Sequence, residues 1–328
     1  MRRFTFFLFV FISTLLLLSI LDTRFNSSQL YKSIDGLLSH LIDRPTVYPE
    51  NSRQAAPSSS RITTRTRETN VLELASWNVR VFSSSSRDDY ELGKICEVLQ
   101  RYDFVALQEL RDTEVLNRSV KILKDRGFPF SFVVSPKVGS GTHKEMYAFL
   151  FRTDAVSHLG FPSLYPDPGD RFIREPFVGH FRSGNFDFSI ATVHVIYKSR
   201  NAPERAVELS ALADVFKWVQ EVNRNENDVL LTGDFNEHPD SPRFARLLSI
   251  EGLEMLIRGS DVTTVIFDSS LYDNIAFSAK YTSHEYSDTC GVFKFDEEMF
   301  SSDDEASRVC SDHRPVWARF ATDLADDD

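Results

Sequence analysis

The residues Asp228-Val-Leu-Leu-Thr-Gly-Asp-Phe-Asn-Glu-His-Pro239 combine a strand with a candidate site. An apolar run of strand length ends at Gly233, and two oxygen-bearing side chains, Asp234 and Asn236, follow it. Residues two apart in an extended backbone point to the same face, so this carboxylate and this amide can converge on one reacting atom at a strand end. Asp and Asn also commonly cap a turn after a strand, and this stretch alone leaves both interpretations open.

Strand and helix patterns alternate through the rest of the chain. Apolar residues at three- and four-residue intervals predict helices over about 90–99, 115–124 and 203–222. Runs of strand character occupy residues 71–77, 104–107, 130–134, 147–151, 186–193, 229–231, 272–277 and 315–320. This alternation predicts an α/β protein with a mixed sheet covered by helices.

Composition limits the classes of function. The 328 residues are 42% hydrophobic and 12% aromatic, which is ample for a large core, and their net charge is −11. This acidity argues against a protein that holds nucleic acid through a broad basic surface. A carboxylate-rich site that binds a divalent metal can still present local positive charge to phosphate, so nucleic acid is compatible as a transient substrate.

The N-terminus predicts entry into the secretory route. Met1-Arg2-Arg3 precedes the mostly apolar residues 4–21, which form either a signal peptide or an uncleaved membrane anchor. No small-residue cleavage site stands out after residue 21, which favours the anchor. The two arginines favour an N-terminus that stays in the cytosol while the rest of the chain is translocated across the membrane. Residues 22–70 are predicted to be a flexible stalk, 71–321 the domain and 322–328 an acidic tail. The domain would then be lumenal or extracellular.

Three cysteines permit at most one internal disulfide. Cys96 falls within a helical pattern and is predicted to be a buried apolar residue. Cys290 and Cys310 bracket the acidic residues 295–307, so they could clip this predicted loop in an oxidising compartment. Sequence alone does not fix the pairing.

Polar side chains recur at the ends of the predicted strands, where α/β proteins place their sites. Taken singly, each has a structural explanation, such as a turn residue, a surface ion pair or a core histidine. Together they predict one cleft. The set comprises Asn78, Gln108, Glu109, Arg111, Glu145, His194, Asp234, Asn236, Asp273, Asp312 and His313.

The order of these motifs carries a family resemblance. They run Trp77-Asn78, Gln108-Glu109-Leu-Arg111, Lys144-Glu145-Met-Tyr147, Arg174-Glu-Pro176, His194, Gly233-Asp234-Phe-Asn236, Tyr272-Asp273 and Ser311-Asp312-His313-x-Pro315. The series resembles the endonuclease/exonuclease/phosphatase superfamily, specifically its deoxyribonuclease I branch, over residues 72–320. The resemblance implies a four-layer α/β sandwich of two packed mixed sheets flanked by helices. It also implies a divalent-metal-dependent phosphodiesterase, most simply a deoxyribonuclease I-like endonuclease.

The resemblance implies a metal site. Glu109, assisted by Asn78 and Asp312, would hold Mg²⁺, a cation that takes oxygen ligands and keeps exchangeable waters. Mn²⁺ is an alternative metal, and a role for Ca²⁺ is left open.

The resemblance also implies two histidine–carboxylate pairs that bracket the scissile phosphate. His194 would pair with Glu145, and His313 with Asp273. A carboxylate partner fixes the imidazole tautomer and raises its basicity, so one pair can help activate water while the other protonates or stabilises the leaving oxygen. Asp234 would orient or deprotonate the water.

Phosphate-binding groups complete the implied site. Asn236 would donate hydrogen bonds to the phosphoryl oxygens, and Arg111 and Arg174 would clamp phosphate through their planar guanidinium groups. DNA is the implied substrate, the membrane would be contacted only through an uncleaved anchor, and no stable protein partner is implied.

Three departures from the deoxyribonuclease pattern concern the surface for duplex DNA. His143 stands in place of a tyrosine, Met146 in place of an arginine beside it, and Asn274 in place of an arginine after the Tyr-Asp pair. They predict intact catalysis with an altered grip on double-stranded DNA.

Two other functions remain open from sequence. The same superfamily includes phosphatases and phosphodiesterases that act on lipid headgroups or inositol phosphates, which would suit a membrane anchor. A catalytically silent binding module is a third reading, but its expected mark is an eroded site, and the site motifs here are complete.

Overall fold

The computed structural model describes residues 70–141, 144–197, 202–223, 226–259, 262–267 and 270–325. The predicted signal or anchor and the predicted stalk, apart from Asn70, lie outside these residues, as does His143. Within the described ranges, no helix is both long and apolar enough to cross a membrane.

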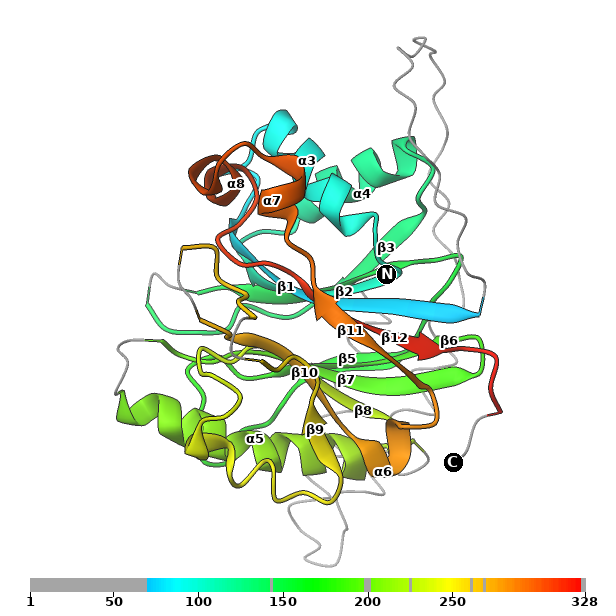
Figure 1. The fold of residues 1–328 in the computed structure, drawn as a ribbon, viewed down its shortest axis with the longest axis vertical. Coiled ribbons are helices and arrows are strands. Elements are labelled where there is room, and N and C mark those ends of the chain that lie inside the picture. The colour runs from blue at the N-terminus through cyan, green and yellow to red at the C-terminus, as the bar shows by residue number, and fades with distance from the viewer. Residues whose placement is uncertain are drawn as a thin grey trace, which may run out of the picture. The chain divides into compact units, whose positions relative to one another are not determined.

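The first sheet has six strands in the order β11-β12-β1-β2-β4-β3. It is mixed, because β1 runs parallel to β2 and antiparallel to β12 (Figure 1). Its strands are β1 (Val71–Phe82), β2 (Phe104–Leu110), β3 (Phe130–Val134), β4 (Met146–Arg152), β11 (Tyr286–Val292) and β12 (Val316–Ala321).

The second sheet also has six strands, in the order β5-β6-β7-β8-β10-β9. Here β7 and β8 are parallel, while β10 pairs antiparallel with β8. Its strands are β5 (Ser157–Leu164), β6 (Phe177–Ser183), β7 (Phe186–His194), β8 (Val229–Asp234), β9 (Leu253–Met255) and β10 (Asp273–Ser278).

Apolar side chains hold these layers together in three clusters. The central cluster fills the space between the sheets and is rich in phenylalanine, with Phe104 of the first sheet 4.8 Å in ring-centroid distance from Phe181 of the second. Such edge-to-face pairs contribute about 0.5–1.5 kcal/mol beyond the burial of their area. The other two clusters lie on the outer faces, under the helices. The predicted four-layer sandwich of two mixed sheets flanked by helices is confirmed.

Helices cover both outer faces. The first sheet carries α3 (Asp89–Leu99), α4 (Glu114–Asp125), α7 (Phe295–Met299) and α8 (Asp303–Val309), and the second carries α5 (Pro203–Val222) (Figure 1). The shorter elements are η1 (Pro242–Phe244) and α6 (Ala279–Thr282). The three helices predicted from apolar spacing correspond to α3, α4 and α5.

The acidic segment 295–307 is not the loop that the sequence predicts, since it contains α7 and most of α8. The side chain of Ser302 accepts a hydrogen bond from the backbone N–H of Glu305, which caps α8. The acidic residues of the first turn then complement the helix dipole.

The cysteines are all free. Cys310 is buried in the outer cluster beneath the helices of the first sheet, whereas Cys290 packs against the central cluster. The two thiols therefore belong to different layers, and the clip considered from sequence is absent. Cys96 is buried as predicted, and burial raises the pKa of its thiol to about 12.

Candidate active site

The strand directions bring the predicted residues to one edge of the sandwich. Parallel β7 and β8 end side by side at His194 and Asp234, and antiparallel β10 begins opposite them at Asp273. In register, His194 pairs with Asp234 and Asp234 pairs with Asp273. The side chains of His194, Asp234 and Asp273 thus lie in a row across neighbouring strand ends of the second sheet.

Gly233 allows this row to form. Its φ of 138° lies outside the range that other residues adopt readily, and a Cβ there would stand 2.0 Å from the carbonyl oxygen of Val193. The close approach of β7 and β8 beside Asp234 therefore requires glycine.

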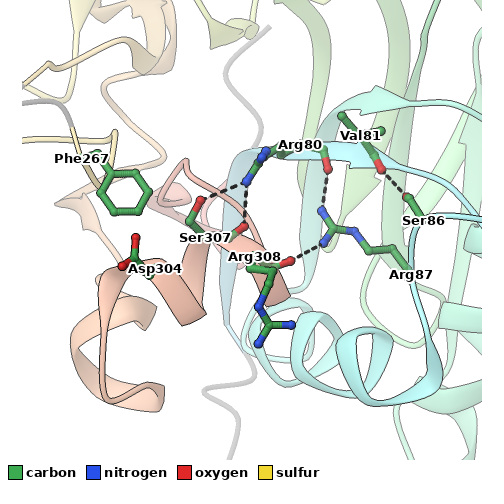
Figure 2. Close-up of a pocket in the computed structure, with 8 residues that line it drawn as sticks. All are labelled: Arg80, Val81, Ser86, Arg87, Phe267, Asp304, Ser307 and Arg308. Carbon is green, nitrogen blue, oxygen red and sulfur yellow. Dashed lines mark hydrogen bonds between the residues drawn. The ribbon is translucent and has the colours of Figure 1, made fainter.

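A bulge in β1 shapes the facing edge of the first sheet. Arg80 and Val81 have φ values of 33° and 48°, and the left-handed region is costly for a β-branched residue. Hydrogen bonds hold them there: Arg87 donates to the carbonyl of Arg80, and the hydroxyl of Ser86 donates to that of Val81 (Figure 2). The bulge turns both backbone N–H groups toward the predicted metal ligands.

Oxygen donors gather at this bulge. The N–H of Arg80 donates to Asn78 Oδ1 at 3.0 Å, and that of Val81 donates to Glu109 Oε2 at 2.9 Å. Asn78 Nδ2 lies 3.3 Å from Glu109 Oε1, and the carboxylate of Asp312 lies 4.0 Å from Arg80 Nε. Two carboxylates and an amide oxygen are the donor chemistry that Mg²⁺ or Mn²⁺ takes, so the three predicted residues fit such an ion.

The surroundings of Glu109 favour the ionised form of its carboxyl group. Burial opposes ionisation of its carboxyl, but the neighbouring His194 and the hydrogen bonds from Val81 and Asn78 outweigh this effect. Its pKa therefore lies below the ordinary value, and the group is an anion at neutral pH.

Two histidine–carboxylate pairs form as the resemblance implied. His194 Nδ1 lies 2.7 Å from Glu145 Oε1, and His313 Nδ1 lies 2.9 Å from Asp273 Oδ2. The Nε2 atoms of the two rings face the same oxygen, Asp234 Oδ2, at 3.6 and 3.8 Å. Asp234 therefore stands between the two imidazoles.

The carboxylates around the two buried imidazoles alter the pKa values of these rings. Burial disfavours the imidazolium of His313, but Asp273 and Asp234 outweigh it and raise the pKa of the ring to about 10. Burial also opposes the charge on His194, and Glu145 raises the pKa of that ring above its ordinary value. The pKa values of both rings therefore lie above the ordinary value for histidine.

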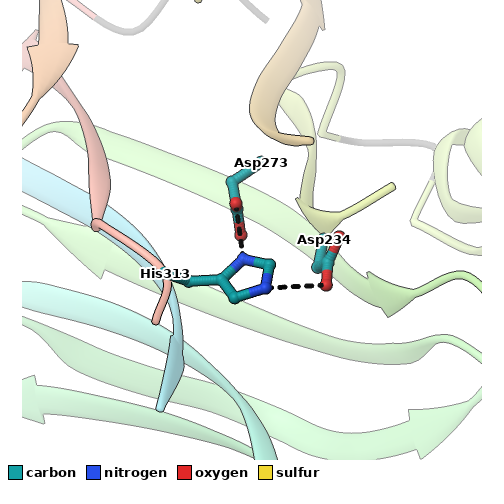
Figure 3. Close-up of side chains that lie close together, drawn as sticks. All are labelled: Asp234, Asp273 and His313. Carbon is teal, nitrogen blue, oxygen red and sulfur yellow. Dashed lines mark hydrogen bonds and ion pairs between the residues drawn. The ribbon is translucent and has the colours of Figure 1, made fainter. Parts of the chain in front are cut away.

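Asp234, Asp273 and His313 are also a possible divalent-metal site. Each offers a ligand atom, and these atoms lie within 4.8 Å of one another (Figure 3). His313 Nδ1 is hydrogen-bonded to Asp273, so the ring would bind a cation there through Nε2, which faces Asp234 Oδ2 at 3.8 Å. The all-oxygen group at the bulge is the better match to a hard divalent cation.

The predicted phosphate-binding residues also lie at this edge, but much of their polar capacity is used within the protein. Asn236 Nδ2 donates to the carbonyl of Val195 at 2.8 Å and lies 3.3 Å from Asp234 Oδ2. Arg174 Nε donates to the carbonyl of His194 at 2.9 Å.

Arg111 lies beside the oxygen donors. Its guanidinium donates to the carbonyl of Lys144 at 2.8 Å and stands 3.6 Å from Glu109 Oε2. Direct contact of phosphate with Asn236, Arg174 or Arg111 stays a prediction.

Sequence reasoning missed Glu208 on α5. Its buried carboxylate accepts hydrogen bonds from the N–H groups of Ile173 and Ile196, at 2.9 and 2.8 Å. Ile173 directly precedes Arg174, and Ile196 lies two residues after His194. Glu208 therefore holds the backbone of both segments in place. The sequence feature that could have identified it is a glutamate on the apolar helix face that also carries Leu209 and Leu212.

Two of the departures do not act at the surface. Met146 is 7% exposed and packs in the outer cluster of the first sheet. Asn274 is 2% exposed, and its amide donates to and accepts from the backbone of Ile257. Neither side chain is therefore offered to a substrate, and the altered grip on double-stranded DNA stays a prediction.

Comparisons with known proteins agree with this geometry. Residues 75–297 match the Endonuclease/Exonuclease/phosphatase family. The chain is 34% identical over 270 residues to "Deoxyribonuclease-1-like 2" of Mus musculus, with 77% of this chain and 92% of that protein covered. It is 32% identical to "Deoxyribonuclease" of Thioalkalivibrio sp. (strain K90mix), with 76% and 71% covered. An endonuclease/exonuclease/phosphatase from Bacteroides vulgatus shares the fold with a TM-score of 0.54 and 16% identity, covering 76% of this chain and 98% of that chain.

Proposed function

The chain belongs to the endonuclease/exonuclease/phosphatase family, and we propose that it is a divalent-metal-dependent endonuclease of the deoxyribonuclease I type that hydrolyses phosphodiester bonds in DNA. The observation that carries the proposal is the convergence of two carboxylate-held histidines on Asp234, at 3.6 and 3.8 Å. The names of the deoxyribonuclease relatives support DNA as the substrate class.

Asn78, Glu109 and Asp312 would hold Mg²⁺, with Mn²⁺ as an alternative. The ion would supply positive charge to a phosphate oxygen in a protein whose net charge is −11.

The two imidazoles would handle the protons. Because each Nδ1 is bound to a carboxylate, each ring is fixed with Nε2 directed at the centre of the site. One of His194 and His313 would help activate water, with Asp234 orienting it, and the other would protonate or stabilise the leaving oxygen. Well-positioned proton transfer of this kind contributes about 10²–10⁴-fold to rate.

The remaining polar residues would bind phosphate or hold the machinery. Asn236 and Arg111 stand near Asp234 and Glu109, where they can donate to phosphoryl oxygens as charge builds. Arg174 contacts the carbonyl of His194 and the carboxylate of Glu145, so phosphate binding by Arg174 would accompany a positioning role.

Purified protein tests the proposal. Supercoiled plasmid, single-stranded DNA, RNA and phosphoinositides would be incubated with Mg²⁺, Mn²⁺ or a chelator, beside an Asp234→Asn variant. We expect chelator-sensitive cleavage of DNA that the variant lacks. Cleavage of phosphoinositides without DNA would instead support the lipid-headgroup alternative, which the deoxyribonuclease relatives do not favour.

We also propose that residues 1–21 direct the chain into the secretory route, on the strength of the two arginines before the apolar run. Expression in cells, followed by fractionation and N-terminal sequencing, separates the two forms of this proposal. An anchored chain stays with alkali-washed membranes, whereas a cleaved chain is released with a new N-terminus. Retention in the cytosol would contradict both.

A further inference from the structure

A basic pocket adjoins the proposed metal ligands. Its volume is about 420 Å³, within the range of sites for small organic ligands. Three arginines line it, Arg80, Arg87 and Arg308, against a single acidic residue, Asp304. This concentration of positive charge lies in a chain with a net charge of −11.

The arginines play different parts. Arg87 is 7% exposed, and its guanidinium donates to several backbone carbonyls, including those of Arg80 and Cys310, so it builds the wall. Arg80 donates to the hydroxyl of Ser307 at 3.1 Å. The exposed guanidinium of Arg308, by contrast, makes no hydrogen bond or ion pair within the part of the chain that the structure describes. Arg308 can therefore bind an anion without giving up an existing partner.

An aromatic side chain forms another wall of the pocket. Phe267 is 60% exposed, and Figure 2 shows its ring beyond Ser307 as seen from Arg87, on the same side of the pocket as the carboxylate of Asp304. An exposed phenylalanine and an exposed guanidinium that line one pocket match the two parts of an unpaired nucleotide. A flat base can stack on the ring while the phosphate meets a guanidinium.

The pocket continues the proposed active site. Arg80 and Val81 line it, and their backbone N–H groups contact Asn78 and Glu109. A strand whose scissile phosphate lies at the oxygen donors would thus place a neighbouring nucleotide within reach of Phe267.

We propose that this pocket is a subsite for an unpaired nucleotide next to the scissile phosphate, with the base stacked on Phe267 and a phosphate bound by Arg308. The inference rests on the proposed nuclease function and extends it to a substrate class. A base inside a closed duplex is already stacked on both sides and cannot reach the ring. The enzyme should therefore bind single-stranded or frayed DNA more tightly than closed duplex.

Binding to the full chain carrying Asp234→Asn, which prevents cleavage, tests the subsite directly. Fluorescence anisotropy would follow a labelled single-stranded oligonucleotide and a closed hairpin of the same sequence. Phe267→Ala should weaken single-strand binding on the order of tenfold and leave the hairpin within about twofold. Phe161→Ala, which removes a phenylalanine of 62% exposure on β5, is the matched control and should change neither.

Arg308→Gln should weaken single-strand binding and lower its dependence on salt, because one phosphate contact is lost. Lys217→Gln, which removes one exposed positive charge from α5, controls for net charge. Unchanged single-strand affinity in Phe267→Ala, or equal losses on single strand and hairpin, would overturn the subsite.

Cleavage by the chain without Asp234→Asn is measured separately. If the parent chain cleaves plasmid but Phe267→Ala binds single-stranded DNA as tightly as the parent, the subsite is rejected and the nuclease function is kept. If Phe267→Ala selectively loses single-strand binding while the parent chain cleaves no substrate, the subsite is supported and the nuclease function is rejected.

Discussion

Asn78 joins the two sheets at the centre of the site, because its side-chain amide donates to Asp234 Oδ2 at 3.2 Å. Asn78 ends the regular part of β1 in the first sheet, and Asp234 ends β8 in the second. Asn78 is 1% exposed and Asp234 is equally buried. This buried amide therefore helps to hold the two halves of the proposed machinery in register, together with the amide of Gln108, which donates to Thr192 Oγ1 at 2.8 Å.

Asn78→Ala should lower both stability and activity. The substitution leaves the buried carboxylate of Asp234 and the half-buried carboxylate of Glu109 each with one partner fewer, at a cost of about 1–3 kcal/mol in the free energy of unfolding. Urea denaturation with and without Mg²⁺ measures this cost, and cleavage assays measure the loss of rate. A variant with unchanged stability and rate would show that the amide does not hold the sheets together.

His313→Ala and His194→Ala should each reduce the cleavage rate about 10²–10⁴-fold and leave the fold intact, because each removes a proton-transfer group. Neither is proposed as a metal ligand, so Mn²⁺ binding followed by electron paramagnetic resonance should persist. His284→Ala, which alters a histidine outside the site, is the control. An unfolded His313→Ala protein would instead assign that ring a structural role.

The sequence predicts much of this site, for identifiable physical reasons. Asp234 and Asn236 lie together at the end of β8, but through a turn and not through an extended backbone, since Asn236 has a φ of 50° and its N–H donates to Asp234 Oδ1 at 2.9 Å. The pairing of His194 with Glu145, 49 residues apart in the chain, depends on tertiary structure and came only from the family resemblance. The subsite residue Phe267 lies in no periodic pattern, so only the structure reveals it.

Four strands that the sequence does not predict, β5, β6, β9 and β11, lack a long unbroken apolar run. β5 lies at a sheet edge, is largely solvent-exposed and contains Gly160 and Pro162, so it lacks the apolar run of a central strand. β11 is the corresponding edge of the first sheet and alternates poorly. β6 is internal, but Gly179 and His180 interrupt its apolar character. A continuous apolar run, such as Val229 to Leu231 in β8, is what makes a strand predictable from sequence.

Glu109→Gln should weaken metal binding as well as rate. The loss of one anionic ligand should raise the Mg²⁺ concentration for half-maximal cleavage by at least about tenfold, with a parallel loss of Mn²⁺ affinity measured without substrate. Glu114→Gln, at the start of α4, is a charge-matched control. An unchanged metal titration would remove Glu109 from the ligand set.

Asp214 should make stability depend on pH in the acid range. Hydrogen bonds and charge from Arg246 and Arg171 lower the pKa of Asp214 to about 2 against the opposing effect of burial. Because the folded pKa lies below the unfolded value of about 3.9, the stabilisation is complete above that value and is lost as pH falls toward 2.

Asp214→Asn should therefore reduce the free energy of unfolding at pH 7 on the order of 1 kcal/mol, a figure reduced for the partial exposure of the pair. Its stability should also fall less between pH 4 and 2 than that of the parent. Asp125→Asn removes an exposed carboxylate that has one lysine partner, and should change little. Equal acid sensitivity of parent and Asp214→Asn would contradict the assignment.

Removal of residues 1–69 should leave a soluble, active domain, since β1 begins at Val71 and the central cluster starts with Leu72. The cut precedes Asn70, because the carbonyl of Asn70 accepts a hydrogen bond from Thr322 and ties β1 to the end of β12. Thermal unfolding and plasmid cleavage by the shortened protein should match those of the full chain. Removal of Asn70 as well should lower the melting temperature slightly, by the loss of one backbone hydrogen bond worth about 1 kcal/mol. An insoluble product from the first cut would mean that residues 1–69 cover part of the domain, and the proposed boundary at residue 71 would then be wrong.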